Sequence, residues 1–369
     1  MGIYKDKTFA QSITKLIQKE NLSHGESKSA FSTIFKNETN DLQQGGFLAA
    51  LVAKGETRDE VAGCWEAIYN DDTEKVDLSD IATVDNCGTG MDDHKTFNVS
   101  TAASIIAASS GIPMARHGAR AITSVCGTVD IAEALGVDVD CSVAMVAGSI
   151  RSTNLGLFNG MSPMVHPAAL GRILSQVFFG TTLNISASLA NPALPGIGVR
   201  GVYKKELLIP VLEVMREIGY TKAITVYGTV EGSEKGIDEA SVSGTTYIAE
   251  LTGDGSIKEY SINSVELGLG KYDIKECAPK QSIAREVEVF LKLFTGKKNG
   301  ARKNMVLLNA ALVLKIAGLS PTLDVSIAEA RALLESGKAL ATLKAWVSAQ
   351  NSNPEAGNKK LQSILERIR

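Results

Sequence analysis

From residue 82 onward the sequence alternates between short strand-like segments, glycine-rich turns and helical segments. The strands are predicted at residues 82–85, 112–115, 198–203, 222–227 and 242–251, and helices between them at 100–110, 129–135 and 207–218. Strands that alternate with helices across tight glycine turns are typical of a mainly parallel sheet. We therefore expect an α/β domain with a mainly parallel central sheet.

The first 80 residues contain no convincing strand and are predicted to be helical. Two capping boxes, Ser23 with Glu26 and Thr57 with Glu60, indicate helix starts. A small all-helical domain is therefore expected at the N-terminal end of the chain.

The remaining segments complete the expected organisation. We predict a helical domain over 1–80 to which 163–192 returns, and an α/β domain made of 81–162 and 193–369. Residues 283–349 are expected to form three more helices, and the polar tail after Asn351 is expected to be peripheral.

Charge and cysteine content restrict the function classes. The 369 residues carry 38 basic and 41 acidic side chains, a net charge of −3, which argues against a nucleic-acid binder with a wholly basic surface. The five cysteines form no CxxC pair, which favours a reduced compartment. The N-terminal segment has no apolar signal-peptide core, and no stretch reaches the roughly 18 unbroken apolar residues of a membrane span. We expect a cytoplasmic protein that does not enter a membrane.

The turn after the first predicted strand, residues 87–101, has the composition of a phosphate site. Backbone N–H groups of a glycine turn, aimed together with a helix N-terminus, bind anions. The alternative is a tight strand-to-helix turn with a helix cap. The small or acidic residues that this hypothesis uses are Gly88, Gly90, Asp92, Thr96, Asn98, Ser100 and Thr101, of which Asp92 would orient donors or act beside a metal.

Two further loops carry charged residues. Arg116, His117 and Arg120 gather positive charge after the second strand, and the small-residue stretch that contains Ser124 and Thr128 follows. Loops after adjacent parallel strands meet at one edge of the sheet, so a cleft is expected there; the alternative is a solvated basic loop. The adjacent carboxylates Asp238 and Glu239 would suit Mg²⁺, although an Asp-Glu pair is more often simply exposed.

Taken together, these motifs resemble the anthranilate phosphoribosyltransferase family. Its glycine loop GTGGD–TFNIST is matched by residues 88–92 and 96–101, its KHGNR loop by 116–120, and its metal-binding Asp-Glu pair by 238–239. Shorter matches, such as His166-Pro167 and Leu307-Leu308-Asn309-Ala310-Ala311, extend the collinear resemblance from about residue 12 to 349.

The resemblance implies transfer of the 5-phosphoribosyl group from phosphoribosyl pyrophosphate (PRPP) to the amine of anthranilate in tryptophan biosynthesis. Pyrophosphate is released, and no covalent nucleophile is expected. Mg²⁺ would be held by Ser100, Asp238 and Glu239, and the chain would be a homodimer through its helical domain. The implied PRPP-binding residues are Gly88, Thr89, Gly90, Asp92, Thr96, Asn98, Ser100, Thr101, Arg116 (where the family has Lys) and Thr128 (where it has Ser).

The acceptor half departs from the family pattern. Ala119 replaces the family's anthranilate-contacting Asn, and Gln176 stands where we align its carboxylate-binding Arg, a place that Arg172 could take instead. The expected acceptor-binding residues are thus His117, Ala119, Arg172 and Gln176. Met91 also replaces the second glycine of GTGGD.

These departures leave alternatives open. The first is a PRPP-dependent transferase that acts on a different aromatic or heterocyclic amine. A nucleoside phosphorylase of the same fold is disfavoured by the Asp-Glu pair. A non-enzymatic nucleic-acid-binding relative is disfavoured by the mixed charge of the helical segment.

Overall fold

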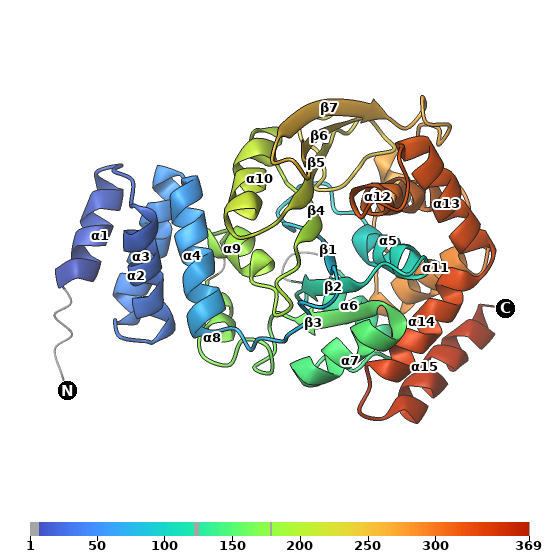
Figure 1. The fold of residues 1–369 in the computed structure, drawn as a ribbon, viewed down its shortest axis with the longest axis horizontal. Coiled ribbons are helices and arrows are strands. Elements are labelled where there is room, and N and C mark those ends of the chain that lie inside the picture. The colour runs from blue at the N-terminus through green and yellow to red at the C-terminus, as the bar shows by residue number, and fades with distance from the viewer. Residues whose placement is uncertain (1–6, 122–124, 178, 369) are drawn as a thin grey trace.

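The fold is centred on one seven-stranded sheet with the strand order β3-β2-β1-β4-β5-β6-β7 (Figure 1). The computed structural model describes residues 7–121, 125–177 and 179–368. The strands are β1 (Val84–Gly88), β2 (Met114–Gly118), β3 (Leu155–Asn159), β4 (Ile197–Gly201), β5 (Lys222–Gly228), β6 (Thr245–Leu251) and β7 (Ile257–Asn263). The predicted mainly parallel sheet is confirmed, since the five strands from β3 to β5 in this order run parallel and only the β5–β6 and β6–β7 pairs are antiparallel.

The order of the parallel strands creates a switch point between β1 and β4. The chain goes from β1 outward to β2 and β3, then returns to the other side of β1 with β4, whose Gly201 pairs with Gly88. At such a point the loops that follow the two strands diverge, and open α/β sheets bind ligands in the resulting crevice.

Helices cover both faces of the sheet. Helices α5 and α12 lie against one face, and α7, α9 and α10 lie against the other. The helices of this part are α5 (Val99–Ala108), α6 (Thr128–Leu135), α7 (Val143–Thr153), α8 (Leu170–Leu174), α9 (Leu183–Leu189), α10 (Leu208–Glu217), α11 (Ile283–Phe294), α12 (Ala301–Ile316), α13 (Leu323–Glu335), α14 (Lys338–Ala349) and α15 (Pro354–Arg367).

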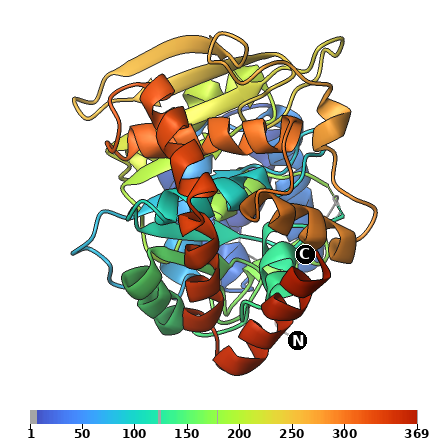
Figure 2. The same ribbon diagram turned by 90° about the vertical axis from the view of Figure 1, so that its right-hand side faces the viewer.

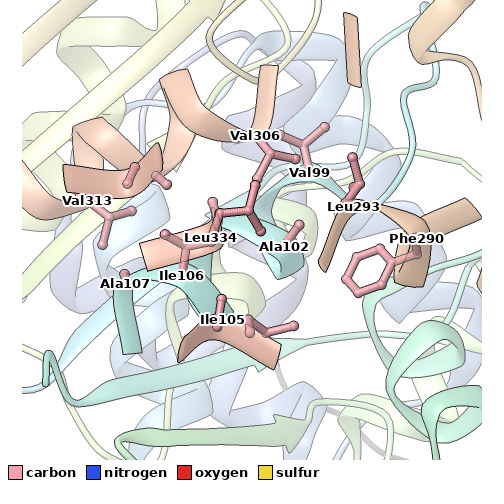
Figure 3. Close-up of a cluster of buried hydrophobic side chains, with 14 of the residues drawn as sticks. Val99, Ala102, Ile105, Ile106, Ala107, Phe290, Leu293, Val306, Val313 and Leu334 are labelled. Carbon is pink, nitrogen blue, oxygen red and sulfur yellow. The ribbon is translucent and has the colours of Figure 1, made fainter. Parts of the chain in front are cut away.

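The main core lies between the sheet and the C-terminal helices. Helix α5 is buried along most of its length and packs against α12, so that Ile105 and Ile106 belong to the same buried cluster as Val306 and Val313 (Figure 3). Small residues such as Ala102 allow the two helices to approach closely. This packing holds the N-terminus of α5 at the carboxyl edge of the sheet.

Four helices form a separate layer at the N-terminal end, on the left of Figure 1: α1 (Lys7–Ile17), α2 (His24–Phe35), α3 (Asp41–Lys54) and α4 (Arg58–Asp71). Both predicted capping boxes are confirmed, at the starts of α2 and α4. Their core contains Phe9, Phe31 and Phe47, and Leu170 of α8 and Leu183 of α9 belong to the same apolar cluster. The domain boundaries at 80, 163 and 192 stay a prediction.

Three expectations about the C-terminal half and the sheet are wrong. Residues 283–349 form four helices (α11 to α14) rather than three, and strands β3 and β7 were not expected. The tail is not peripheral, because α15 buries Leu361, Ile364 and Leu365 against the core; the C-terminal helices are drawn in red in Figure 2. Across the described ranges, no helix combines the length and the apolar character that crossing a membrane requires.

Candidate active site

The glycine turn after β1 lies at the switch point and binds a carboxylate of another loop. The backbone N–H of Gly90 donates to Asp238 Oδ2 at 2.7 Å, and the Thr89 hydroxyl approaches the same oxygen at 3.4 Å. Gly90 has a φ of +71°, a conformation that favours glycine. The turn thus holds Asp238 beside the backbone that is predicted to bind PRPP.

The loop after β5 brings Asp238 and Glu239 to this point. Gly228 and Ile237 exchange backbone hydrogen bonds, so the chain returns to the edge of the sheet after an eight-residue excursion over 229–236. The Asn309 side chain on α12 then donates to the carbonyl of Ala240 and accepts from its N–H. These bonds fix the backbone on both sides of the carboxylate pair.

Two glycines are required by the closeness of this loop. A Cβ on Gly88 would lie 2.4 Å from Asp238 Oδ2, and a Cβ on Gly201 would overlap the backbone carbonyl of Asp238. Asp238 therefore packs directly on the backbone at the paired ends of β1 and β4.

Three buried carboxyl groups meet here. Burial and then the neighbouring Asp238 carboxylate raise the pKa of Asp92 to about 7. Burial, followed by Asp238 and Asp92, raises the pKa of Glu239 well above its ordinary value, and burial also raises the pKa of Asp238. One cation, the Lys95 ammonium, lies 3.1 Å from Asp92 Oδ1 and also donates to the Gly90 carbonyl.

This excess of buried negative charge fits a divalent cation. Asp238 and Glu239 supply the hard oxygen ligands that Mg²⁺ prefers, and Mg²⁺ commonly binds one or two carboxylates together with substrate phosphates. Within the described ranges no group of three His, Cys, Asp or Glu side chains has the arrangement of a complete metal site. The residues therefore fit a metal that a phosphorylated substrate helps to hold.

Arg116 lies beneath the turn rather than in the open cleft. Its side chain is fully buried, donates twice to the Asn86 carbonyl, and donates to the hydroxyl oxygens of Ser100 (3.1 Å) and Thr101 (2.7 Å). Burial lowers the pKa of its guanidinium. Arg116 thus orients the two hydroxyls at the start of α5, where Ser100 is half-buried.

Asn98 precedes α5 and has an unused acceptor. Its Nδ2 donates to the Cys126 carbonyl, whereas Oδ1 is buried and has no hydrogen-bond partner among the described residues. Thr96, two residues earlier, donates to Glu239 Oε2 at 3.4 Å. The predicted PRPP residues of 88–101 therefore lie together with Asp238 and Glu239.

The end of β2 and the start of α6 lie beside this turn. His117 is buried, with its Nε2 3.2 Å from His166 Nε2, and burial lowers the pKa of His117 well below its ordinary value. Thr128 begins α6, and its methyl group fills the space beside Gly118. Ser124 lies outside the described residues.

The expected acceptor residues are not gathered in one place. The Arg172 guanidinium donates to the Gln44 side chain of α3 and to the Ile34 carbonyl at the end of α2, so it is bound to the helical layer. Gln176 and Ala119 are exposed. The expectation that Arg172 replaces the family's arginine has no support in these contacts, because its hydrogen bonds go to a different part of the molecule.

Sequence reasoning gave no role to three residues that support the site. Lys95 is the cation among the carboxylates, Asn309 fixes the Asp-Glu loop, and Arg302 of α12 lies over the ring of Phe97 at 4.6 Å while it pairs with the buried Glu286. Asn309 stood in a matching motif, but its partner at residue 240 is visible only in the fold.

Comparisons with known proteins cover both parts of the chain. Residues 80–340 match the glycosyl transferase family a/b domain, and residues 10–71 match the helical bundle domain of the same family. The anthranilate phosphoribosyltransferase of Desulfosudis oleivorans is 32% identical over 352 residues, which cover 94% of this chain and 99% of that one. The anthranilate phosphoribosyltransferase of Methanosarcina acetivorans is 34% identical over 90% of this chain and 88% of its own length.

Solved structures have the same fold. The anthranilate phosphoribosyltransferase from Thermus thermophilus has a TM-score of 0.82 and 28% identity, and covers 92% of this chain and 99% of its own. The enzyme from Saccharomyces cerevisiae in complex with PRPP and Mg has a TM-score of 0.83 at 23% identity, with coverage of 95% and 99%, a likeness of fold alone. With matches over both domains and nearly full-length relatives above 30% identity, this chain belongs to the anthranilate phosphoribosyltransferase family.

Proposed function

We propose that this protein transfers the 5-phosphoribosyl group from PRPP to the amine of anthranilate and releases pyrophosphate, a step of tryptophan biosynthesis. One observation carries the proposal: the glycine turn and the start of α5 meet Asp238 and Glu239 at the switch point of the sheet. Donors for phosphate and ligands for a cation are thereby placed in one crevice. The family membership of the chain supports the same activity.

The chain's own groups are suited to a leaving pyrophosphate. The N-terminus of α5 has no side-chain cap, and its Ser100 N–H already donates to the Glu239 carboxylate, so this helix end attracts negative charge. Arg116 holds the Ser100 and Thr101 oxygens through N–H donors, which leaves each hydroxyl proton to donate toward phosphate. The unpaired Asn98 Oδ1 is an acceptor for a ribose hydroxyl.

Asp238 and Glu239, with the Ser100 hydroxyl, are the proposed ligands of Mg²⁺. Bound Mg²⁺ stabilises negative charge that develops on the departing pyrophosphate. Beside this pair, the Lys95 ammonium lies 3.1 Å from Asp92 Oδ1 and stabilises the negative charge of that carboxylate. A cleft built in this way stabilises charge with preorganised groups and needs no covalent nucleophile.

A different aromatic or heterocyclic amine as acceptor is the second candidate. It is favoured by the contacts of Arg172, which bind its guanidinium to α2 and α3, and by the exposed Gln176 at the expected carboxylate position. Glutamine at this position offers no bidentate partner for the carboxylate of anthranilate. An acceptor without a carboxylate does not need that partner.

Two measurements test the proposal. Calorimetry with PRPP, with and without Mg²⁺, should show Mg²⁺-dependent binding, which the double variant Asp238→Asn with Glu239→Gln should lose. A PRPP-consumption screen against aromatic amines, anthranilate included, then identifies the acceptor. Absence of binding at millimolar PRPP, together with salt-dependent binding of DNA, would replace the enzyme hypothesis with the nucleic-acid-binding one.

The assembly and location belong to the same proposal. We propose a homodimer through the helical layer, in which Ile17 and Leu42 are exposed apolar residues. A strictly monomeric mass by light scattering at micromolar concentration would contradict it. A cytoplasmic location stays a prediction; all five cysteines are free thiols, as a reduced compartment requires.

A further inference from the structure

Met91 is fixed at the centre of the glycine turn by bonds on both sides. The preceding residue, Gly90, donates its N–H to Asp238 and accepts at its carbonyl from the Lys95 ammonium, 3.0 Å away. The following residue, Asp92, is buried and lies against Lys95. With the backbone held in this way, the direction in which the Met91 side chain leaves the turn is also fixed.

The thioether end of Met91 reaches the segment that joins α8 to α9. A Cβ added to Gly180 would lie 2.3 Å from Met91 Cε and 3.6 Å from Met91 Sδ. The methyl group therefore rests against the backbone of Gly180, in space that any other residue type would occupy. Met91 is half-buried, so part of its side chain stays accessible.

This contact joins the two halves of the proposed site. Helices α8 and α9 flank Gly180 and pack on the helical layer, through Leu170 and Leu183, whereas Met91 belongs to the PRPP turn. An acceptor amine has to approach within about 3–3.5 Å of the ribose carbon that it attacks. A ring bound between the PRPP turn and the segment that joins α8 to α9 would therefore lie beside the Met91 side chain.

We propose that Met91 is a specificity-determining residue that forms an apolar wall of the acceptor subsite. Its thioether end packs on the backbone of Gly180. This inference rests on the proposed phosphoribosyl transfer. Methionine sulfur makes favourable contacts with aromatic rings and adapts its shape to them. The wall limits the size of substituents on the ring and favours an uncharged ring edge at this place.

A set of single and double variants tests the wall. Met91→Ala should raise the KM for the acceptor about tenfold, the effect of losing about one good apolar contact. PRPP affinity should stay within about twofold, because the backbone bonds of Gly90 do not involve the side chain. Amines with bulkier ring substituents should gain relative to the parent amine. Met91→Leu, which keeps most of the bulk, should restore the parent preference.

Gly180→Ala tests the contact between Met91 and Gly180. The new methyl group displaces the flexible end of Met91 without touching the backbone of the turn, so acceptor use should fall while PRPP binding and the unfolding midpoint are unchanged. In the double variant with Met91→Ala, the effect of Gly180→Ala should disappear, since nothing remains to be displaced. Met145→Ala, a change at a half-buried methionine of α7, is the matched control and should leave acceptor KM unchanged.

The outcomes separate this inference from the function on which it rests. PRPP binding and turnover with unchanged acceptor preference in Met91→Ala would overturn the wall while the transferase function stands. Additive effects of Met91→Ala and Gly180→Ala would contradict the proposed contact between the two residues. Absence of Mg²⁺-dependent PRPP binding in the wild-type chain would instead overturn the proposed function itself.

Discussion

Gly88→Ala should disable the metal site without removing any ligand. The added Cβ would lie 2.4 Å from Asp238 Oδ2, about 1 Å short of the 3.4 Å at which ordinary contacts begin. The carboxylate has to move by that amount, and it is held at the same oxygen by the Gly90 N–H at 2.7 Å. A hydrogen bond to a charged group contributes about 1.5–3 kcal/mol. We therefore expect PRPP to bind roughly 10- to 100-fold more weakly in the presence of Mg²⁺.

Calorimetric titration of PRPP with and without Mg²⁺ measures this effect directly. Gly148→Ala in α7 is the control, because nothing lies within 4 Å of its added Cβ, and it should leave binding unchanged. Introducing Gly88→Ala into Asp238→Asn should cost little further affinity, since both changes act on one carboxylate. Wild-type affinity with intact Mg²⁺ dependence in Gly88→Ala would refute the steric reasoning.

Three further outcomes are expected. The pKa of Asp92 rises from an ordinary value near 4 to about 7 on folding, so between these pH values the native state binds more protons than the unfolded state. The metal-free protein should therefore lose stability as pH rises from about 4 to 7, and the slope should be shallower in Asp92→Asn. Urea unfolding at several pH values measures both. Glu286→Ala leaves the Arg302 charge buried without its carboxylate partner, so the free energy of unfolding should fall by about 3–5 kcal/mol; a loss below about 1 kcal/mol would contradict this. Arg172→Ala should destabilise the contact with α2 and α3 but leave the KM for anthranilate unchanged; loss of anthranilate turnover in a folded variant would instead place Arg172 in the acceptor site.

The parallel sheet was predictable where strands are buried and end in glycine turns. Strand β7 escaped prediction because it lies at the antiparallel edge, where none of its residues is fully buried and no apolar run marks the strand. Strand β3 contains Gly156, which allows Ile150 of α7 to pack closely on it. Glycine in a short segment indicates a turn as readily as a close approach.

The C-terminal helix shows a different limit. The polar start of the tail suggested a peripheral segment, although Asn353 caps α15 and Pro354 occupies its first turn, a pattern typical of a helix start. Its apolar residues are few, Leu361, Ile364 and Leu365 among them, and their burial depends on the surface that α11 and α14 offer. The tertiary structure alone shows what this helix covers.

The residues predicted for the PRPP half lie together in the structure, whereas Arg172 of the predicted acceptor half is bound to the helical layer, and the difference has a physical reason. Phosphate and metal are proposed to bind backbone N–H groups, small side chains and adjacent carboxylates, and each of these motifs is contiguous in the sequence. Acceptor recognition depends on side chains from separate segments, whose directions are set by the packing of helices on the sheet. Met91 stood out in the sequence as a departure from glycine, but its complement, Gly180, is an unremarked glycine far along the chain. A substitution and the space that accommodates it become one feature only when the fold brings the two residues into contact.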